Sequence, residues 1–157
     1  MSLFTNGTTS FGNSTSGSLS ADCTLFNEAF PDFAQYDGFS DCSAFNFYQD
    51  DQGDITSFFL NDGSFDYPIQ INGPIPDSFA DLTYLTYLSL TNANITSVGT
   101  EICTFTALTA LDLSGNSFPS LPDCISDLAQ LQYLTLSFSG LTKLTTGVCE
   151  ITPLSSM

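Results

Sequence analysis

Basic residues are almost absent from this sequence of 157 residues. Lys143 is the single lysine or arginine, there is no histidine, and 17 aspartate and glutamate residues give a formal net charge of −16. Binding to nucleic acid and attraction to anionic lipid both depend on lysine and arginine, so the composition excludes both. The lack of histidine also removes the residue that most often performs acid–base catalysis.

Long apolar segments are missing as well. No run reaches the roughly 18 apolar residues that a membrane-spanning helix requires, so we expect no membrane insertion of this segment. The N-terminal residues lack the basic start and apolar stretch of a signal peptide. We therefore expect either a mature chain or a piece of a longer protein, and we favour the piece.

The sequence contains no recognisable catalytic or cofactor-binding set. It has no CxxC pair, no glycine-rich loop with lysine and no spacing that singles out a carboxylate pair, so we expect no enzyme activity and no cofactor. An acidic cluster could hold calcium through its carboxylate oxygens, but it does not match an EF-hand loop, and we favour a solvated acidic loop. The cluster consists of Asp50, Asp51, Asp54, Asp62 and Asp66.

What the sequence does contain is an internal repeat. Leucines spaced as L-x-x-L-x-L recur every 23 residues, and the apolar positions after them keep the same phase. A divergent earlier copy of 30 residues starts at Ile55. Such a period predicts a solenoid, in which each repeat buries its apolar side against its neighbours. The three triplets are Leu85-Leu88-Leu90, Leu108-Leu111-Leu113 and Leu131-Leu134-Leu136.

The run from Leu108 to Asn116, L-x-x-L-x-L-x-x-N, resembles the signature of leucine-rich-repeat proteins. Residues 72–76, which read N-G-P-I-P, are similar to the plant-type subclass, and residues 22–60 resemble its cysteine-containing N-terminal cap. The resemblance implies an α/β solenoid with short parallel strands on its concave face. It also implies that Asn116 points inward and bonds backbone at a turn, where Ala93 and Ser139 are its counterparts.

This interpretation divides the chain into three parts. We expect an arm rich in Ser, Thr, Gly and Asn over residues 1–21, a cap over 22–54 and repeats over 55–157. The predicted repeats are 55–84, 85–107, 108–130, 131–153 and a partial copy at 154–157. Because the sequence stops inside a repeat, we expect a truncated chain, a longer natural chain or a neighbouring subunit that covers this end.

The residues between the leucines of each strand should line the concave face, because strand side chains alternate. This surface is rich in hydroxyl groups and contains aromatic rings, which suits recognition of a protein or a sugar. An ordinary solvated strand surface is the alternative. The binding candidates are Phe59, Tyr87, Ser89, Asp112, Tyr133 and Thr135.

Three sequons predict N-linked glycosylation, at Asn6, Asn13 and Asn94. Asn94 is the strongest of them, because it falls between two inward positions and should point to solvent. Glycans are therefore expected, although as modifications rather than cofactors.

Five cysteines are present, and disulfides explain them better than a zinc site. Cys103 and Cys149 share a repeat position but lie two repeats apart, roughly 10 Å, which exceeds the ~7 Å limit for a disulfide. Cys124 lies between them and can pair with one but not both. The candidate pairs are Cys23–Cys42 and Cys103–Cys124.

Two functions fit these features, both outside or at the surface of a cell. The scarcity of charge and of lysine favours a structural glycoprotein of a fibre, sheath or wall, which associates head to tail with further copies of itself. The alternative is a fragment of a receptor-like ectodomain that binds a protein, peptide or glycan on its concave face. In both cases the chain acts as a non-catalytic scaffold.

Overall fold

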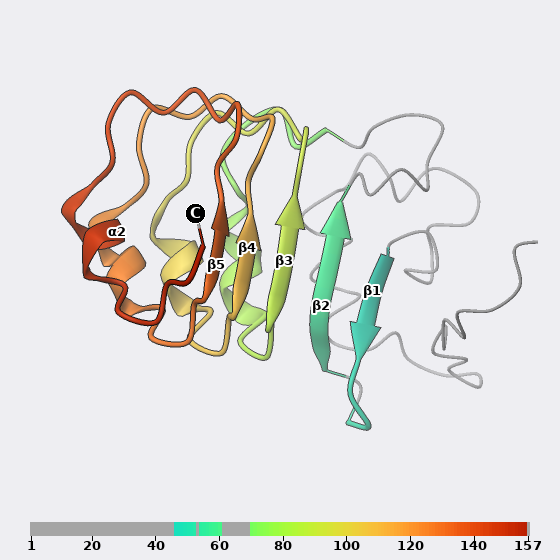
Figure 1. The fold of residues 1–157 in the computed structure, drawn as a ribbon. Helices are drawn as coiled ribbons and strands as arrows, with labels where there is room; N and C mark the ends of the chain where they lie inside the picture. The colour runs from blue at the N-terminus through green and yellow to red at the C-terminus, as the bar shows by residue number, and fades with distance from the viewer. Residues whose placement is uncertain (1–45, 53, 61–69, 157) are drawn as a thin grey trace, which may run out of the picture.

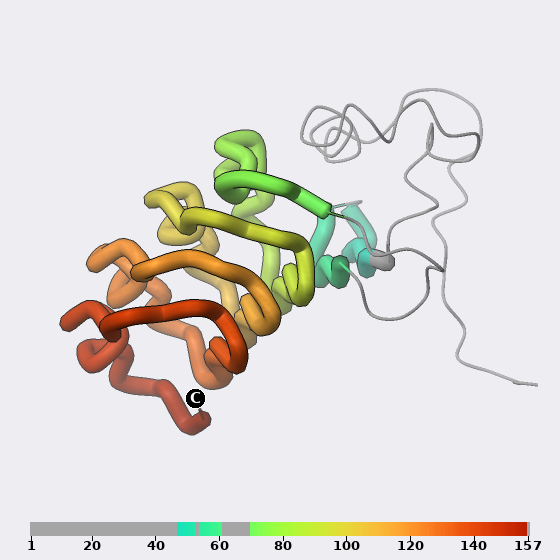
Figure 2. The backbone as a smooth tube through the Cα atoms, turned by 90° about the horizontal axis from the view of Figure 1, so that it is seen from above, coloured from blue at the N-terminus to red at the C-terminus, as the bar shows by residue number. Residues whose placement is uncertain are grey.

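The computed structural model describes residues 46–52, 54–60 and 70–156. Over these residues the chain forms a stack of coils (Figure 1, Figure 2). Each coil has a short strand on one side and a short helix on the opposite side. This is the leucine-rich-repeat fold that the 23-residue period predicts.

The strands form one sheet in the order β1-β2-β3-β4-β5 within the described residues. Strands β2 (Ile55–Leu60), β3 (Tyr87–Leu90), β4 (Ala110–Asp112) and β5 (Tyr133–Thr135) are parallel. Their register keeps equivalent repeat positions side by side, so that Phe58, Leu88, Leu111 and Leu134 form one row. The constant spacing of the leucines therefore fixes which residues are neighbours across the sheet.

Strand β1 (Asn46–Gln49) departs from this pattern, because it is antiparallel to β2. It lies within the region that we expected to form the cap. The connection to β2 is held by the Asp50 carboxylate, which accepts hydrogen bonds from the N–H groups of Gln52 and Asp54 at 2.9 and 3.0 Å. Asp50, which we considered as a calcium ligand, thus stabilises a turn, while Asp62 and Asp66 lie outside the described residues.

Short helices occupy the convex side at equivalent places in successive repeats. They are the 3-10 helices η1 (Asp77–Asp81), η2 (Thr100–Thr104) and η3 (Asp123–Asp127), followed by the α-helix α2 (Thr146–Glu150). A coil of 23 residues leaves room for about one turn of helix on this side, and 3-10 helices are typical of such short pieces.

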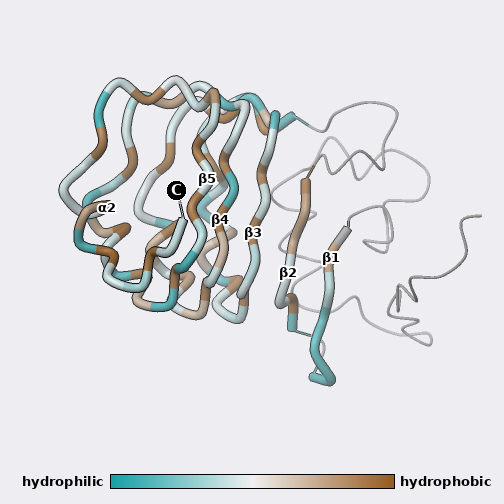
Figure 3. Tube along the Cα trace, in the orientation of Figure 1, coloured by the Kyte–Doolittle hydropathy of each residue, from teal (hydrophilic) through white to brown (hydrophobic). Residues whose placement is uncertain are grey.

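The core runs through the centre of the stack. The inward leucines of the first two triplets, with Leu131 and Leu134 of the third, are buried, and so are apolar residues that follow the strands, such as Ile95, Phe118 and Ile125. Leu136 in the last coil is only partly buried. Hydrophobic residues accordingly recur along each coil (Figure 3). Because each repeat contributes only one layer, the core depends on contact between neighbours rather than on any single coil.

A line of hydrogen bonds joins the coils near the start of the strands. The N–H of Thr86 donates to Thr56 O at 2.7 Å, that of Thr109 donates to Thr86 O at 2.8 Å, and that of Gln132 donates to Thr109 O at 2.8 Å. The hydroxyls of Thr86 and Thr109 donate to the same carbonyls as their own N–H groups. The line continues to Ser155, whose N–H donates to Gln132 O.

Candidate binding site on the concave face

Parallel register arranges the outward strand residues in two rows across the concave face. The first row is Ser57, Tyr87, Ala110 and Tyr133, and the second is Phe59, Ser89, Asp112 and Thr135. The six candidates predicted from the sequence therefore lie on one surface. Ser89 differs from the others because it is buried, so it forms part of the floor of this surface rather than a point of contact.

Aromatic side chains gather at the N-terminal side of this surface. The rings of Phe59 and Tyr87 stack with centroids 4.7 Å apart and an angle of 26° between their planes. Tyr48 from β1 meets Phe59 edge to face at 6.0 Å. These contacts restrict the rings, so a partner would lose little side-chain freedom on binding to them.

Tyr48 was missed by our sequence analysis. Only the antiparallel pairing of β1 with β2 adds it to the concave face, and the repeat period says nothing about residues that precede the first repeat. Two strand-like segments on either side of the turn at residues 50–54 were the available signal for a hairpin.

At the centre of the concave face a small residue, Ala110, lies between two tyrosines. Ala110 lies beside Tyr87 on one side and beside Tyr133 on the other, and Tyr133 is 54% exposed. Asp112 follows two residues after Ala110 on the same strand and the same face. Its Oδ1 atom accepts the N–H of Ser114 at 2.9 Å, which restricts the orientation of the carboxylate.

Asp112 is the only charged side chain in strands β2 to β5. The surface thus combines exposed rings and hydroxyl groups with one carboxylate. Nothing among the described residues suggests a metal centre, since no three His, Cys, Asp or Glu side chains gather in the required manner.

The sequon asparagine Asn94 lies in the turn after β3 and is exposed, as expected from its place in the repeat. Its side-chain N–H donates to Asn72 Oδ1 in the preceding coil at 2.9 Å. Glycosylation of Asn94 stays a prediction. Asn6 and Asn13 lie outside the described residues.

Cys103 and Cys124 form a disulfide between η2 and η3, with Cα atoms 5.9 Å apart. This pairing leaves Cys149 in α2 as an exposed thiol. The two remaining cysteines of the other predicted pair, Cys23 and Cys42, lie outside the described residues.

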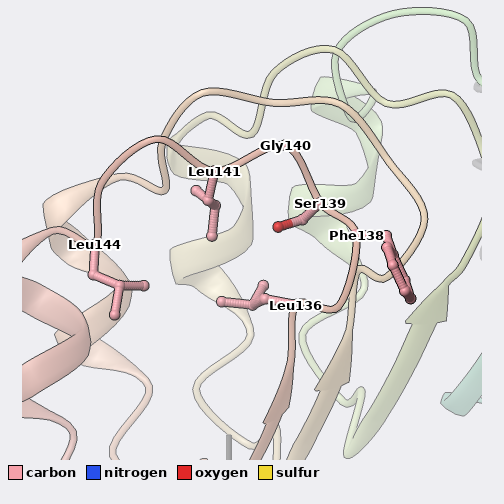
Figure 4. Close-up of a pocket in the computed structure, with 6 residues that line it drawn as sticks. All are labelled: Leu136, Phe138, Ser139, Gly140, Leu141 and Leu144. Carbon is pink, nitrogen blue, oxygen red and sulfur yellow. The ribbon is translucent and has the colours of Figure 1, made fainter.

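A hollow of about 340 Å³ lies in the coil that follows β5. Leu136, Leu141 and Leu144 point toward one another there, whereas Phe138 points away from them (Figure 4). Leu144 is 47% exposed, although its counterparts in the earlier coils, Leu121 and Val98, are buried. Phe138 is 94% exposed. The side chains around this hollow are therefore largely apolar.

The aligned parallel strands and the stacked coils define a leucine-rich-repeat fold. In agreement, residues 83–141 match the family model described as leucine rich repeat. No curated protein matches the sequence significantly. Among the described residues, no helix has both the length and the apolar character needed to cross a membrane.

Solved structures share this architecture. An LRR protein of Leptospira interrogans is 29% identical, with a TM-score of 0.52, and the match covers 54% of this chain and 22% of that one. The PEPR1–AtPEP1 crystal structure gives 22% identity and a TM-score of 0.67, covering 87% of this chain and 20% of the other. The LRR ectodomain of the receptor kinase SOBIR1 from Arabidopsis thaliana gives 20% identity and a TM-score of 0.61. This match covers 86% of this chain and 76% of that one.

The chain therefore spans about a fifth of the length of the first two proteins. At these identities the two plant structures establish the fold alone. The chain contains leucine-rich repeats and has the solenoid fold of plant receptor ectodomains.

Proposed function

We propose that this protein is an extracellular, non-catalytic recognition module that binds a protein or peptide partner on its concave face. The observation that carries the proposal is the concave surface itself, where Phe59, Tyr87 and Tyr133 are held on aligned strands among hydroxyl groups. Tyrosine provides a large contact area with few rotatable bonds, and it is enriched at binding surfaces for that reason.

Three features support a location outside the cell. The Cys103–Cys124 disulfide is typical of an oxidising compartment. The exposed Asn94 sequon would be glycosylated on the secretory route. The fold is also that of the SOBIR1 ectodomain.

A selected ligand tests the proposal. Peptides are selected from a random-sequence display library on the full chain, and their affinities are then measured for Tyr133→Ala and Tyr84→Ala. The two tyrosines are a matched pair, because they are 54% and 57% exposed and Tyr84 lies outside the strands. We expect Tyr133→Ala to weaken binding about tenfold or more and Tyr84→Ala to leave it within about twofold. Equal losses of peptide affinity in the two variants would mean that the peptides do not bind at the concave face.

Self-association is the second candidate, and it is the function that our sequence analysis favoured. The observation in its favour is the apolar end of the last coil, with Leu144 and Phe138 exposed beside the hollow. Copies that join through this end would build a fibre or layer if the contact is head to tail, since such contacts need not close.

Sedimentation velocity over a wide concentration range tests this candidate. If the end surface joins copies, the sedimentation coefficient should rise with concentration, and Leu144→Asp should abolish the rise. Ser126→Asp, on the convex side, is the charge-matched control. A sedimentation coefficient that stays that of a monomer at all concentrations would remove this candidate and leave the recognition module.

A further inference from the structure

We infer that the space over Ala110, between Tyr87 and Tyr133, binds a cationic side chain of the partner, and that arginine is the side chain it fits best. We call these three residues, together with Asp112, the tyrosine notch. The inference rests on the proposed function, because it names the chemistry that the concave face would recognise. It deepens that proposal by assigning one contact to one kind of residue.

The spacing of the strands gives the notch its width. Tyr87, Ala110 and Tyr133 are direct neighbours on three consecutive strands. Strands lie about 4.8 Å apart, so the two tyrosine positions are separated by roughly 10 Å, with only a methyl group between them. If the two rings stand up from their strands, a cation placed over Ala110 would lie between them, roughly 5 Å from each. Cation–π attraction acts within ~6 Å of a ring centroid.

The faces of the rings are arranged to use this space. Phe59 belongs to β2 and stacks on Tyr87 at 4.7 Å, so it covers the face of Tyr87 directed toward β2. Phe59 does not cover the opposite face, and a cation over Ala110 would approach the ring from that side. Tyr133 is the more exposed of the two tyrosines and can turn its ring over the same methyl group.

Asp112 supplies the counter-charge. It follows Ala110 by two residues on the same face of β4, which places its Cα roughly 7 Å along the strand. Its Oδ1 accepts the Ser114 N–H, and among the described contacts its Oδ2 accepts none. An arginine that lies over Ala110 can therefore donate to Oδ2 without displacing an existing hydrogen bond.

The charge of the chain favours a cationic partner over a neutral one. The net charge is −16, and Lys143, the single basic side chain, lies outside the concave strands. A neutral sugar could stack on the rings but would not require a carboxylate beside them. Arginine fits better than lysine, because its planar guanidinium group can stack on a ring and donate to a carboxylate at the same time.

A pair of small probes tests the notch directly. N-acetyl-arginine methylamide is titrated into the full chain, and ring signals of labelled tyrosine are followed by NMR. N-acetyl-citrulline methylamide, which has nearly the same shape without the charge, is the comparison. We expect saturable shifts of the Tyr87 and Tyr133 signals with arginine, and binding about tenfold weaker or more with citrulline. Equal binding of the two probes would overturn the inference.

Two aspartate variants separate a specific contact from general attraction. Asp112→Asn keeps the shape and the acceptor for the Ser114 N–H, whereas Asp127→Asn makes the same change of net charge in η3 on the convex side. We expect Asp112→Asn to weaken the arginine probe about fivefold or more and Asp127→Asn to change it by less than about twofold. Equal losses in the two variants would reduce the effect to overall charge and overturn the inference.

The selected peptides then distinguish this inference from the proposed function. Suppose that their binding is lost in Tyr133→Ala, is unchanged in Asp112→Asn and does not require arginine. The concave face is then the binding surface, but the notch is not an arginine site. If the peptides bind elsewhere while the arginine probe still shifts Tyr87 and Tyr133, the notch stands and the proposed function fails.

Discussion

The side chain of Asn116 hydrogen-bonds the backbone of Ala93, the residue at the equivalent position one repeat earlier. Asn116 Oδ1 accepts the N–H groups of Ala93 and Ile95 at 3.1 and 3.0 Å. Its Nδ2 donates to the carbonyls of Leu90 and Leu113, both at 2.8 Å. One buried amide therefore serves the turns of two coils, including one whose own residue at this position is alanine.

Replacement of Asn116 by alanine should destabilise the protein strongly. The change leaves the N–H groups of Ala93 and Ile95 without the partner they have now, and each unsatisfied buried polar group costs about 1–3 kcal/mol. We expect Asn116→Ala to lower the free energy of unfolding by about 3–5 kcal/mol in urea denaturation. Ser139→Ala, at the counterpart position one repeat later, is the control and should cost less than about 1 kcal/mol. Similar losses in both variants would contradict this role for Asn116.

The middle of the solenoid core and its last coil should respond differently to the loss of a leucine. Leu111 is 1% exposed in the middle of the stack, whereas Leu144 is 47% exposed at its end. Leu111→Ala should cost about 2–5 kcal/mol because it leaves a cavity between neighbouring coils. Leu144→Ala should cost about 1 kcal/mol or less, since its side chain already contacts solvent. Denaturant titration of both variants measures the difference, and equal costs would mean that the end is as tightly packed as the centre.

The sequence predicted the repeats well because the fold copies their period directly. The leucines at constant spacing are buried, except that Leu136 in the last triplet is only partly buried, and the residues between them line the concave face. The role of Asn116 also followed from its place in the signature. These features depend only on the position within a repeat, which is readable from one sequence.

Features outside the period were not predictable in this way. Strand β1 precedes the repeats and pairs antiparallel with β2. The repeat period therefore could not predict that Tyr48 lies on the concave face. The partner of Cys124 was also ambiguous, because Cys124 lies two residues before the repeat position that Cys103 and Cys149 share, one repeat away from each of them. The structure pairs it with Cys103, while Cys149 lies exposed in α2, an α-helix where the earlier repeats have 3-10 helices.

The disulfide should make a measurable contribution to stability. Cys103 and Cys124 are separated by 21 residues, and closing a loop of this length restricts the unfolded chain by about 3 kcal/mol in the chain-entropy account. We expect the double change Cys103→Ser with Cys124→Ser to lower the free energy of unfolding by about that amount. Cys149→Ser removes an exposed thiol and should be neutral. Alkylation of the native protein followed by peptide mapping should label Cys149 but neither Cys103 nor Cys124, and labelling of Cys124 would contradict the pairing.

Phe138 has a backbone conformation that its own side chain disfavours. Its φ is 54°, and the residues at the same position in the two preceding repeats are Gly115, with φ 70°, and Asn92, with φ 52°. Left-handed backbone costs an ordinary residue about 1–2 kcal/mol, and glycine and asparagine tolerate it best. Because the ring is 94% exposed, the phenylalanine gains little from burial in return.

Phe138→Asn should therefore raise the free energy of unfolding by about 1 kcal/mol. Phe138→Ala is the matched control, since it removes the same exposed ring but keeps a residue that disfavours positive φ, and it should leave stability nearly unchanged. Urea denaturation of the dilute protein measures both. If the two variants gained equally, the ring itself rather than the backbone would be the source of the cost. If Phe138→Asn lost stability, the ring would have a favourable contact in solution, and the end surface that it borders would be the place to search for it.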